Sequence, residues 1–186
     1  MREKLLEAAQ VLVQDRGFNG VSFQGLADAV GLKKPSVFHH FQNKEELAKS
    51  LMESCRTTYG ARYGEVLSRS DVSEPEKLRK VAGIFEEGLK KGHLCLLGAL
   101  SSDCSAYSEE LQIEMKETAD LCIERYAGVF EEGRSAGTLH FEGSSEAAAT
   151  AFLAMLQGLQ VLARAKGDPS AFTPAADSYI DSIARK

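Results

Sequence analysis

The sequence predicts an all-α protein of about nine helices. Apolar residues recur at three- and four-residue spacing along most of the 186 residues, and helix start and stop signals separate these periodic segments. The best candidate for a strand, residues 138–141, lacks a partner strand and is interpreted as a connector. At 44% hydrophobic residues the chain can bury a sizeable core, either as one domain or as a small head on a larger body.

The amino-terminal part has the spacing of a helix-turn-helix. An apolar stripe comes first, formed by Leu5, Ala9, Leu12 and Val13. Residues 23–41 then match two short helices that cross at a tight turn, with Ala27 at their closest approach and Gly31 in the turn. The apolar positions that would pack this pair are Phe23, Leu26, Val30, Leu32 and Val37.

The second helix of this motif, residues 33–40, carries donors that suit phosphate oxygens and base edges in a DNA major groove. They are Lys33, Lys34, Ser36, His39 and His40. DNA binding is therefore the first hypothesis. For either histidine the alternative is an ordinary surface or packing role, and two adjacent histidines are poorly placed to chelate one metal ion.

The remaining helices follow from caps and periodicity. Asn43 is expected to cap a long helix, with Glu46 three residues on as in a capping box. The next helix starts at Ser73 and ends at Gly92, and a short apolar segment covers residues 93–106. Three more helices are predicted over residues 108–133, over residues 145–166 and from Thr173 through Ile183. The domain organisation expected is a head of residues 1–46 and a body of residues 47–186.

Charge and composition are compatible with a DNA-binding regulator. The net charge of −5 is uneven, because residues 1–50 hold seven Lys and Arg against six Asp and Glu, which leaves −6 for the remainder. An acidic body disfavours indiscriminate DNA binding. No apolar leader follows Met1 and no membrane span is predicted, so a cytoplasmic location is expected. The four cysteines follow no C-x-x-C spacing and should be thiols in a reducing compartment.

Catalytic motifs are missing from the sequence. It has no G-x-S-x-G elbow, no phosphate-cradling glycine loop and no H-E-x-x-H, so we expect no enzyme and no cofactor. His93, Cys95 and Cys104 form a weak metal pattern without a fourth ligand, and no metal is expected. The alternative function kept open is a helical enzyme or carrier that acts on a reactive small molecule through Cys95.

The order and spacing of these anchors resemble one family. Leu5-Leu-Glu-Ala-Ala9, Asp15-Arg-Gly-Phe18, Val30-Gly-Leu32 and the run Ser36-Val-Phe-His-His-Phe-Gln-Asn-Lys-Glu-Glu-Leu47 look like the amino-terminal domain of the TetR/AcrR transcriptional regulators. One departure is Phe38, where the family usually has tyrosine, whose hydroxyl commonly contacts a phosphate. The resemblance implies double-stranded operator DNA as partner, contacted through Ser22, Lys33, Lys34, Pro35, Ser36, His39, His40 and Lys44.

The resemblance also implies the function of the body. It predicts a homodimeric repressor that a small apolar or electrophilic effector releases from a palindromic operator. Residues expected near the effector, or in a plain core, are Cys55, Phe85, Leu89, Cys95, Cys104, Met115, Cys122 and Tyr126. Residues expected at the dimer contact of the last two helices are Ala148, Ala151, Phe152, Met155, Leu159 and Ile180. The segment that begins at Cys95 resembles the C-L-x-G stretch of regulators that sense electrophiles or oxidants. The alternative is that Cys95 is a small buried core residue without a sensing role.

Overall fold

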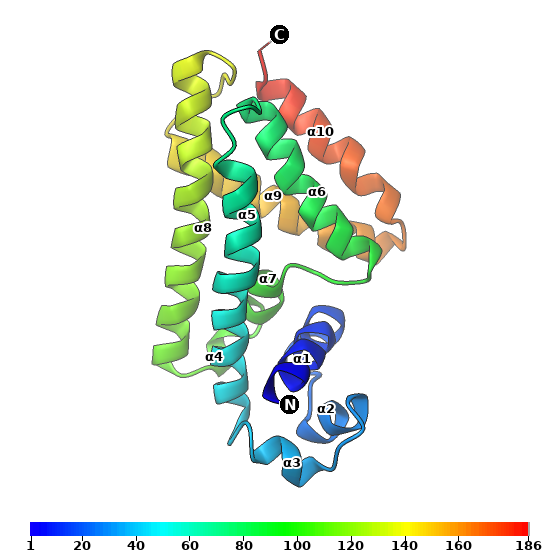
Figure 1. Cartoon of the computed structure of the whole chain (residues 1–186). Helices are drawn as coiled ribbons and strands as arrows, with labels where there is room; N and C mark the ends of the chain where they lie inside the picture. Colours follow the sequence, from blue (N-terminus) through cyan, green and yellow to red (C-terminus); the bar gives the residue numbers. More distant parts are fainter. Residues whose placement is uncertain (186) are drawn as a thin grey trace. The chain divides into compact units, whose positions relative to one another are not determined.

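A computed structural model describes residues 1–185, together with all of their side chains except that of Ala106. Within this range the chain forms helices and no β-strand, as the sequence predicts (Figure 1). If the unbroken run from Lys44 to Leu67 is counted as one helix, the described residues contain nine α-helices, which confirms the predicted number.

The chain divides into two compact units. Unit 1 contains Met1–Tyr59 and His93–Thr118, and unit 2 contains Gly60–Gly92 and the residues from Ala119 onward. The chain therefore passes between the units three times, after Tyr59, after Gly92 and after Thr118. The boundary after residue 46, predicted from the sequence, stays a prediction.

Unit 1 is built around α1. This helix packs against α2, α4 and α7 and buries Leu5, Ala9 and Val13, as its apolar stripe predicts. Leu12 is only half-buried, whereas the polar Gln14 is buried. The elements of unit 1 are α1 (Arg2–Arg16), α2 (Phe23–Ala29), α3 (Lys34–Phe38), α4 (Lys44–Ser54), the π-helical turn η1 (Cys55–Tyr59), α7 (Leu96–Ser101), the 3-10 turn η2 (Cys104–Ala106) and the first part of α8 (Glu109–Ala136).

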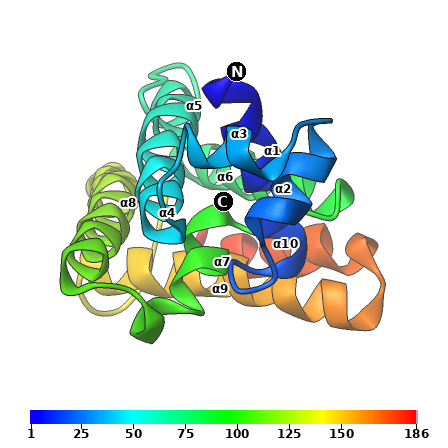
Figure 2. The ribbon, with the colours of Figure 1, turned by 90° about the horizontal axis from the view of Figure 1, so that it is seen from below.

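The helix-turn-helix is formed by α2 and α3, which Figure 2 shows from below. Ser22 caps α2 by accepting a hydrogen bond from the amide of Gly25 at 3.0 Å. Gly31 has a φ of 70° between the two helices, a value that L side chains rarely adopt. α3 is shorter than the predicted residues 33–40, because Lys33 is still extended at its start and His39 follows its last residue.

The long helix after Asn43 begins as predicted but is interrupted. The side chain of Asn43 accepts from the amide of Glu46 at 2.8 Å, whereas the carboxylate of Glu46 accepts from the amide of Gln42 rather than closing the expected box on Asn43. The π-helical turn η1 was not predicted. In it the hydroxyl of Thr57 donates to the carbonyl of Glu53 at 2.9 Å, a local bond that competes with regular helical pairing.

Unit 2 is a helical bundle with an aromatic core. α6 packs against α5, α9 and α10 (Figure 1). The ring of Tyr126 contacts the rings of Tyr63 and Phe152 edge-on, with centroids 6.1 and 5.8 Å apart. The elements of unit 2 are α5 (Gly60–Leu67), α6 (Glu74–Lys90), the rest of α8, α9 (Ser145–Lys166), the 3-10 turn η3 (Pro169–Ala171) and α10 (Phe172–Ile183).

Local signals fix the ends of α9 at the predicted residues. Ser144 accepts from the amide of Ala147 at 3.1 Å, and Gly167 ends the helix in the left-handed conformation. By length and composition alone α9 could cross a membrane, because an 18-residue stretch of it has a mean hydropathy of 1.3. A third of that stretch is buried, and the buried residues include Phe152 and Leu156 of the core of unit 2.

Residues 138–141 connect α8 to α9 without forming a strand, as predicted, but the expectation that they lack a partner was wrong. Leu139 forms an isolated antiparallel bridge with Ala184. The amide of His140 donates to the carbonyl of Ile183 at 2.7 Å, and the amide of Arg185 donates to the carbonyl of Thr138 at 3.0 Å. The partner is a two-residue extension of α10, which is too short to show a strand pattern in the sequence.

Candidate nucleic-acid interface

Six of the eight residues predicted to face DNA lie on α3 and at its two ends, whereas Ser22 precedes α2 and Lys44 begins α4. Lys33, Lys34, Pro35 and His39 are exposed, and Ser36 and His40 are half-buried. The rings of His39 and His40 contact each other edge-on at 5.2 Å. Only the side chain of Val37 turns fully inward, which anchors α3 on the core of unit 1 and leaves the remaining surface of the helix to solvent.

Phe38 presents an apolar surface beside these donors. It is 47% exposed, its ring meets that of Phe23 edge-on at 4.9 Å, and the ammonium of Lys34 lies 5.7 Å from its ring centroid. A hollow of about 470 Å³ adjoins the ring, and Ser22 and Asn43 also line it. This combination of hydroxyl, amide and ammonium groups with an exposed ring suits a phosphate and a base edge.

Lys44 is partly committed to the protein itself. Its Nζ donates to the carbonyl of Phe18 at 3.1 Å and lies 4.8 Å from the centroid of that ring. Burial lowers the pKa of this amine, and the nearby carboxylate of Asp103 opposes that shift. Lys44 therefore fastens the first turn of α4 to the loop between α1 and α2, in addition to the phosphate contact expected from the resemblance.

That loop is also held from η2. The amide and side chain of Asn19 donate to the two carboxylate oxygens of Asp103 at 3.1 and 2.6 Å. The ring of Tyr107 meets that of Phe18 edge-on at 5.3 Å. Residues 103–107 thus support the loop that leads into the helix-turn-helix, a contribution for which the sequence gives no signal.

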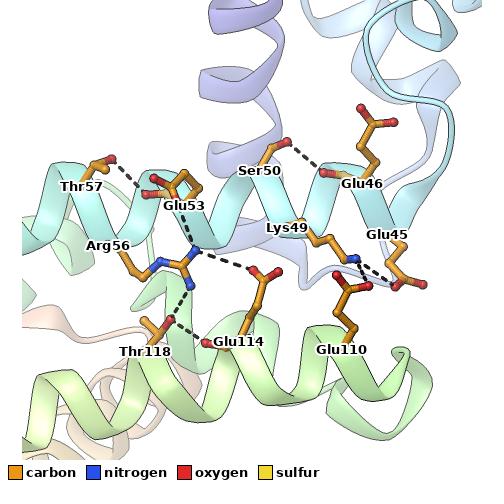
Figure 3. Close-up of polar contacts among 10 residues, drawn as sticks. All are labelled: Glu45, Glu46, Lys49, Ser50, Glu53, Arg56, Thr57, Glu110, Glu114 and Thr118. Atoms are coloured by element: carbon orange, nitrogen blue, oxygen red, sulfur yellow. Dashed lines mark hydrogen bonds and ion pairs between the residues drawn. The ribbon is translucent and has the colours of Figure 1, made fainter.

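A row of polar contacts joins α4 and η1 to the first part of α8 (Figure 3). The ammonium of Lys49 is 2.5 Å from Glu110, and the hydroxyl of Ser108 donates to Glu45. The row continues with Arg56, which is 3.7 Å from Glu114 and donates to Thr118 at 3.4 Å. Partly exposed pairs of this kind contribute about 0–1 kcal/mol each, so they orient α4 more than they stabilise it.

The predicted effector residues are divided between the two units. Cys55, Cys95, Cys104 and Met115 belong to unit 1, whereas Phe85, Leu89, Cys122 and Tyr126 belong to unit 2. Phe85, Leu89 and Tyr126 are buried, as either a closed site or a plain core requires. Cys95 is half-buried immediately before α7. Among the described residues no group of three or more His, Cys, Asp or Glu could hold a metal ion, so His93, Cys95 and Cys104 do not form one.

The predicted dimer residues have different environments. Phe152 and Ile180 are fully buried and Ala148 is nearly so, which places these three in the core of unit 2. Met155 and Leu159 are half-buried, and Ala151 is exposed. The exposed side of α9 also carries the small residues Ala147, Ala154 and Gly158 and the apolar residues Val161 and Leu162.

Comparison with known proteins gives these features a family. Residues 5–51 match the model described as bacterial regulatory proteins, tetR family. The curated repressor KstR2 of Mycolicibacterium smegmatis is 27% identical over 84 residues, which are 45% of this chain and 39% of that protein. The chain therefore aligns with about two fifths of the length of this relative.

The likeness to solved structures extends over the whole chain. A TetR-family regulator from Agrobacterium tumefaciens superposes with a TM-score of 0.92 at 26% identity, covering 99% of this chain and 97% of that one. A TetR regulator from Legionella pneumophila gives a TM-score of 0.88 at 26% identity, covering 100% and 97%. The family model, the shared fold and the exposed α3 together show that this chain is a member of the TetR family of bacterial regulatory proteins.

Proposed function

We propose that the chain is a transcriptional repressor that binds a palindromic operator as a homodimer. The observation that carries this proposal is the exposed surface of the short helix α3, which Val37 anchors. Lys34 lies on this helix, and Lys33 and His39 lie directly before and after it, all three exposed. The relative KstR2 is named a transcriptional repressor, which supports the same direction of regulation. Membership of a family of regulators also argues against the alternative of an enzyme acting through Cys95.

In the proposed complex α3 enters the major groove. Lys33, at the start of this helix, neutralises a phosphate, while Lys34 and His39 reach base edges. The two heads of a dimer must then occupy successive major grooves about 34–36 Å apart. A small change in the separation of the heads therefore abolishes simultaneous docking, which is how an effector would release the operator.

The dimer contact that we propose lies on the exposed side of α9. Small side chains at Ala147, Ala151, Ala154 and Gly158 permit close approach of two helices, and Leu162 offers an apolar side chain that is 57% exposed. Met155 and Leu159, which are half-buried, flank this side. Phe152 and Ile180 support it from within the core.

The effector is proposed to be a small apolar or electrophilic molecule. For an apolar effector the candidates in unit 2 are Phe85, Leu89, Cys122 and Tyr126. For an electrophile the candidate is the thiol of Cys95, which would be modified ahead of the other cysteines. A Cys95→Ser protein should then bind operator normally and fail to respond to a quinone, whereas a normal response would leave non-covalent binding as the release mechanism.

Selection of duplexes from a random library, followed by fluorescence anisotropy at several salt concentrations, tests DNA binding. We expect a palindromic consensus and an affinity that falls steeply with salt. Substitution of Lys34 or His39 by alanine should change the preferred bases. Lys90→Ala, at an exposed position of unit 2, is the matched control and should change nothing. Failure to select any duplex contradicts the proposal. So does an unchanged base preference, relative to the wild type, in the Lys34→Ala and His39→Ala variants.

A further inference from the structure

Gln14 is a buried polar residue with partners from two distant parts of the chain. It is 3% exposed and lies in the last turn of α1. Its Nε2 donates to the carbonyl of Leu94 at 2.8 Å and to the hydroxyl oxygen of Tyr59 at 3.4 Å. A buried amide that loses such partners is left without hydrogen bonds away from water, which is unfavourable, so these contacts are expected to persist during small movements.

The link to Leu94 runs in both directions. While the side chain of Gln14 donates to the carbonyl of Leu94, the backbone carbonyl of Gln14 accepts from the amide of Leu94 at 3.2 Å. The two bonds fix both polar groups of one peptide segment to one residue of α1. The segment just before α7 therefore cannot shift without either moving α1 or breaking both bonds.

The link to Tyr59 is shared with a neighbouring residue. Gln10, one turn earlier on α1, donates to the same hydroxyl oxygen at 3.1 Å. Tyr59 is the last residue of the π-helical turn η1, where the regular helix is already interrupted. Movement at this turn is thus coupled to the same side of α1.

Both partners stand where the chain passes between the units. Tyr59 is the last residue of unit 1 before the chain enters unit 2, and Leu94 is the second residue after the chain returns. At two of the three connections between the units, a residue next to the boundary is therefore hydrogen-bonded to the side chain of Gln14. α1 in turn packs directly against α2 and α4, which flank the DNA-facing α3.

We propose that Gln14 is a positioning residue that couples rearrangements of unit 2 to the orientation of α1 and, through α1, to the DNA-binding helices. The inference rests on the proposed DNA binding, because the operator serves as the ligand that reports coupling. It does not depend on the identity of the effector. Coupling between sites is reciprocal, so operator binding at α3 must also change unit 2 if Gln14 transmits changes toward α3.

The test is amide hydrogen exchange of the full-length protein with and without the selected operator duplex. In the wild type we expect the operator to slow exchange in residues 60–67 and 86–92, which adjoin the two connections. In Gln14→Met this response should fall by at least half, while operator affinity stays within about threefold of the wild type because no DNA-facing side chain is changed. Gln10→Met is the matched control, since it keeps the Leu94 bonds and should keep the response in residues 86–92.

Tyr59→Phe keeps the test decisive even if Gln14→Met does not fold. It removes one hydroxyl and should weaken the response in residues 60–67 alone, because the bonds between Gln14 and Leu94 remain. A full response in a folded Gln14→Met protein, or an unchanged response in residues 60–67 of Tyr59→Phe, overturns the inference. A wild type that binds the operator without any response in unit 2 also overturns it, whereas a wild type that selects no duplex refutes the proposed DNA binding instead.

Discussion

Replacing Lys44 by methionine tests whether this residue stabilises the fold in addition to the phosphate contact expected of it. The substitution keeps an unbranched side chain but removes the ammonium that donates to Phe18 and lies over its ring. Lys33→Met is the matched control, because Lys33 is an exposed lysine at the start of α3. If Lys44 fastens α4 to the loop before α2, only the Lys44 variant should lose stability.

The expected magnitude follows from the contacts. A hydrogen bond from a charged group contributes about 1.5–3 kcal/mol, and the lower end applies because Lys44 is partly exposed. A cation–π contact at such a site adds about 0.5–1 kcal/mol. The sum, about 2 kcal/mol, corresponds to a fall in Tm of about 4–8 °C for a chain of this size. Lys33→Met should leave Tm unchanged but reduce the salt slope of operator binding by about 1.8 per dimer, since each protomer loses one phosphate contact.

Two measurements distinguish these effects. Differential scanning calorimetry gives the change in Tm, and anisotropy titrations between 50 and 200 mM salt, about the range in which counterion release is readily resolved, give the slope. A Lys44→Met protein that melts within about a degree of the wild type would refute the anchoring role. A Lys33→Met protein with an unchanged salt slope would show that the start of α3 does not face phosphates.

Three further outcomes are expected. Leu162→Glu places a charge on the exposed side of α9 and should give monomers in sedimentation, with much weaker operator binding in anisotropy. Ala61→Glu, at an exposed position of α5, is the control for added charge, and a tight Leu162→Glu dimer places the interface elsewhere. Phe38→Tyr adds a hydroxyl to an exposed ring, and if this hydroxyl reaches a phosphate the affinity for all duplexes should rise by up to about tenfold in anisotropy. An unchanged affinity argues against a contact between this ring and the DNA backbone. Gly133→Ala should lower the free energy of unfolding in chemical denaturation by about 1–3 kcal/mol, because the added Cβ would lie 2.5 Å from the side chain of Leu139. An unchanged free energy of unfolding would mean that the Leu139 side chain moves away without cost.

Much of the fold and of the candidate DNA-binding surface follows from local sequence signals. The caps at Ser22 and Ser144 and the left-handed glycines at 31 and 167 act within a few residues, so they mark helix ends before any tertiary contact forms. The stripe of α1 and the donors of α3 are equally local. The effector and dimer residues remain predictions, because periodicity shows that a helix has an apolar side without showing what covers that side.

By itself the sequence determined the all-α class, the positions of the helices and the helix-turn-helix with its exposed lysines, since each depends on spacing and capping within a few turns. Only the tertiary structure decided which side of the apolar α9 is outside, that Lys44 donates to the carbonyl of Phe18, and that Gln14 donates to Leu94 and Tyr59. These features join residues 26 to 80 positions apart. Their partners are chosen by how helices pack against one another, and a contact of that kind leaves no periodic trace along the chain.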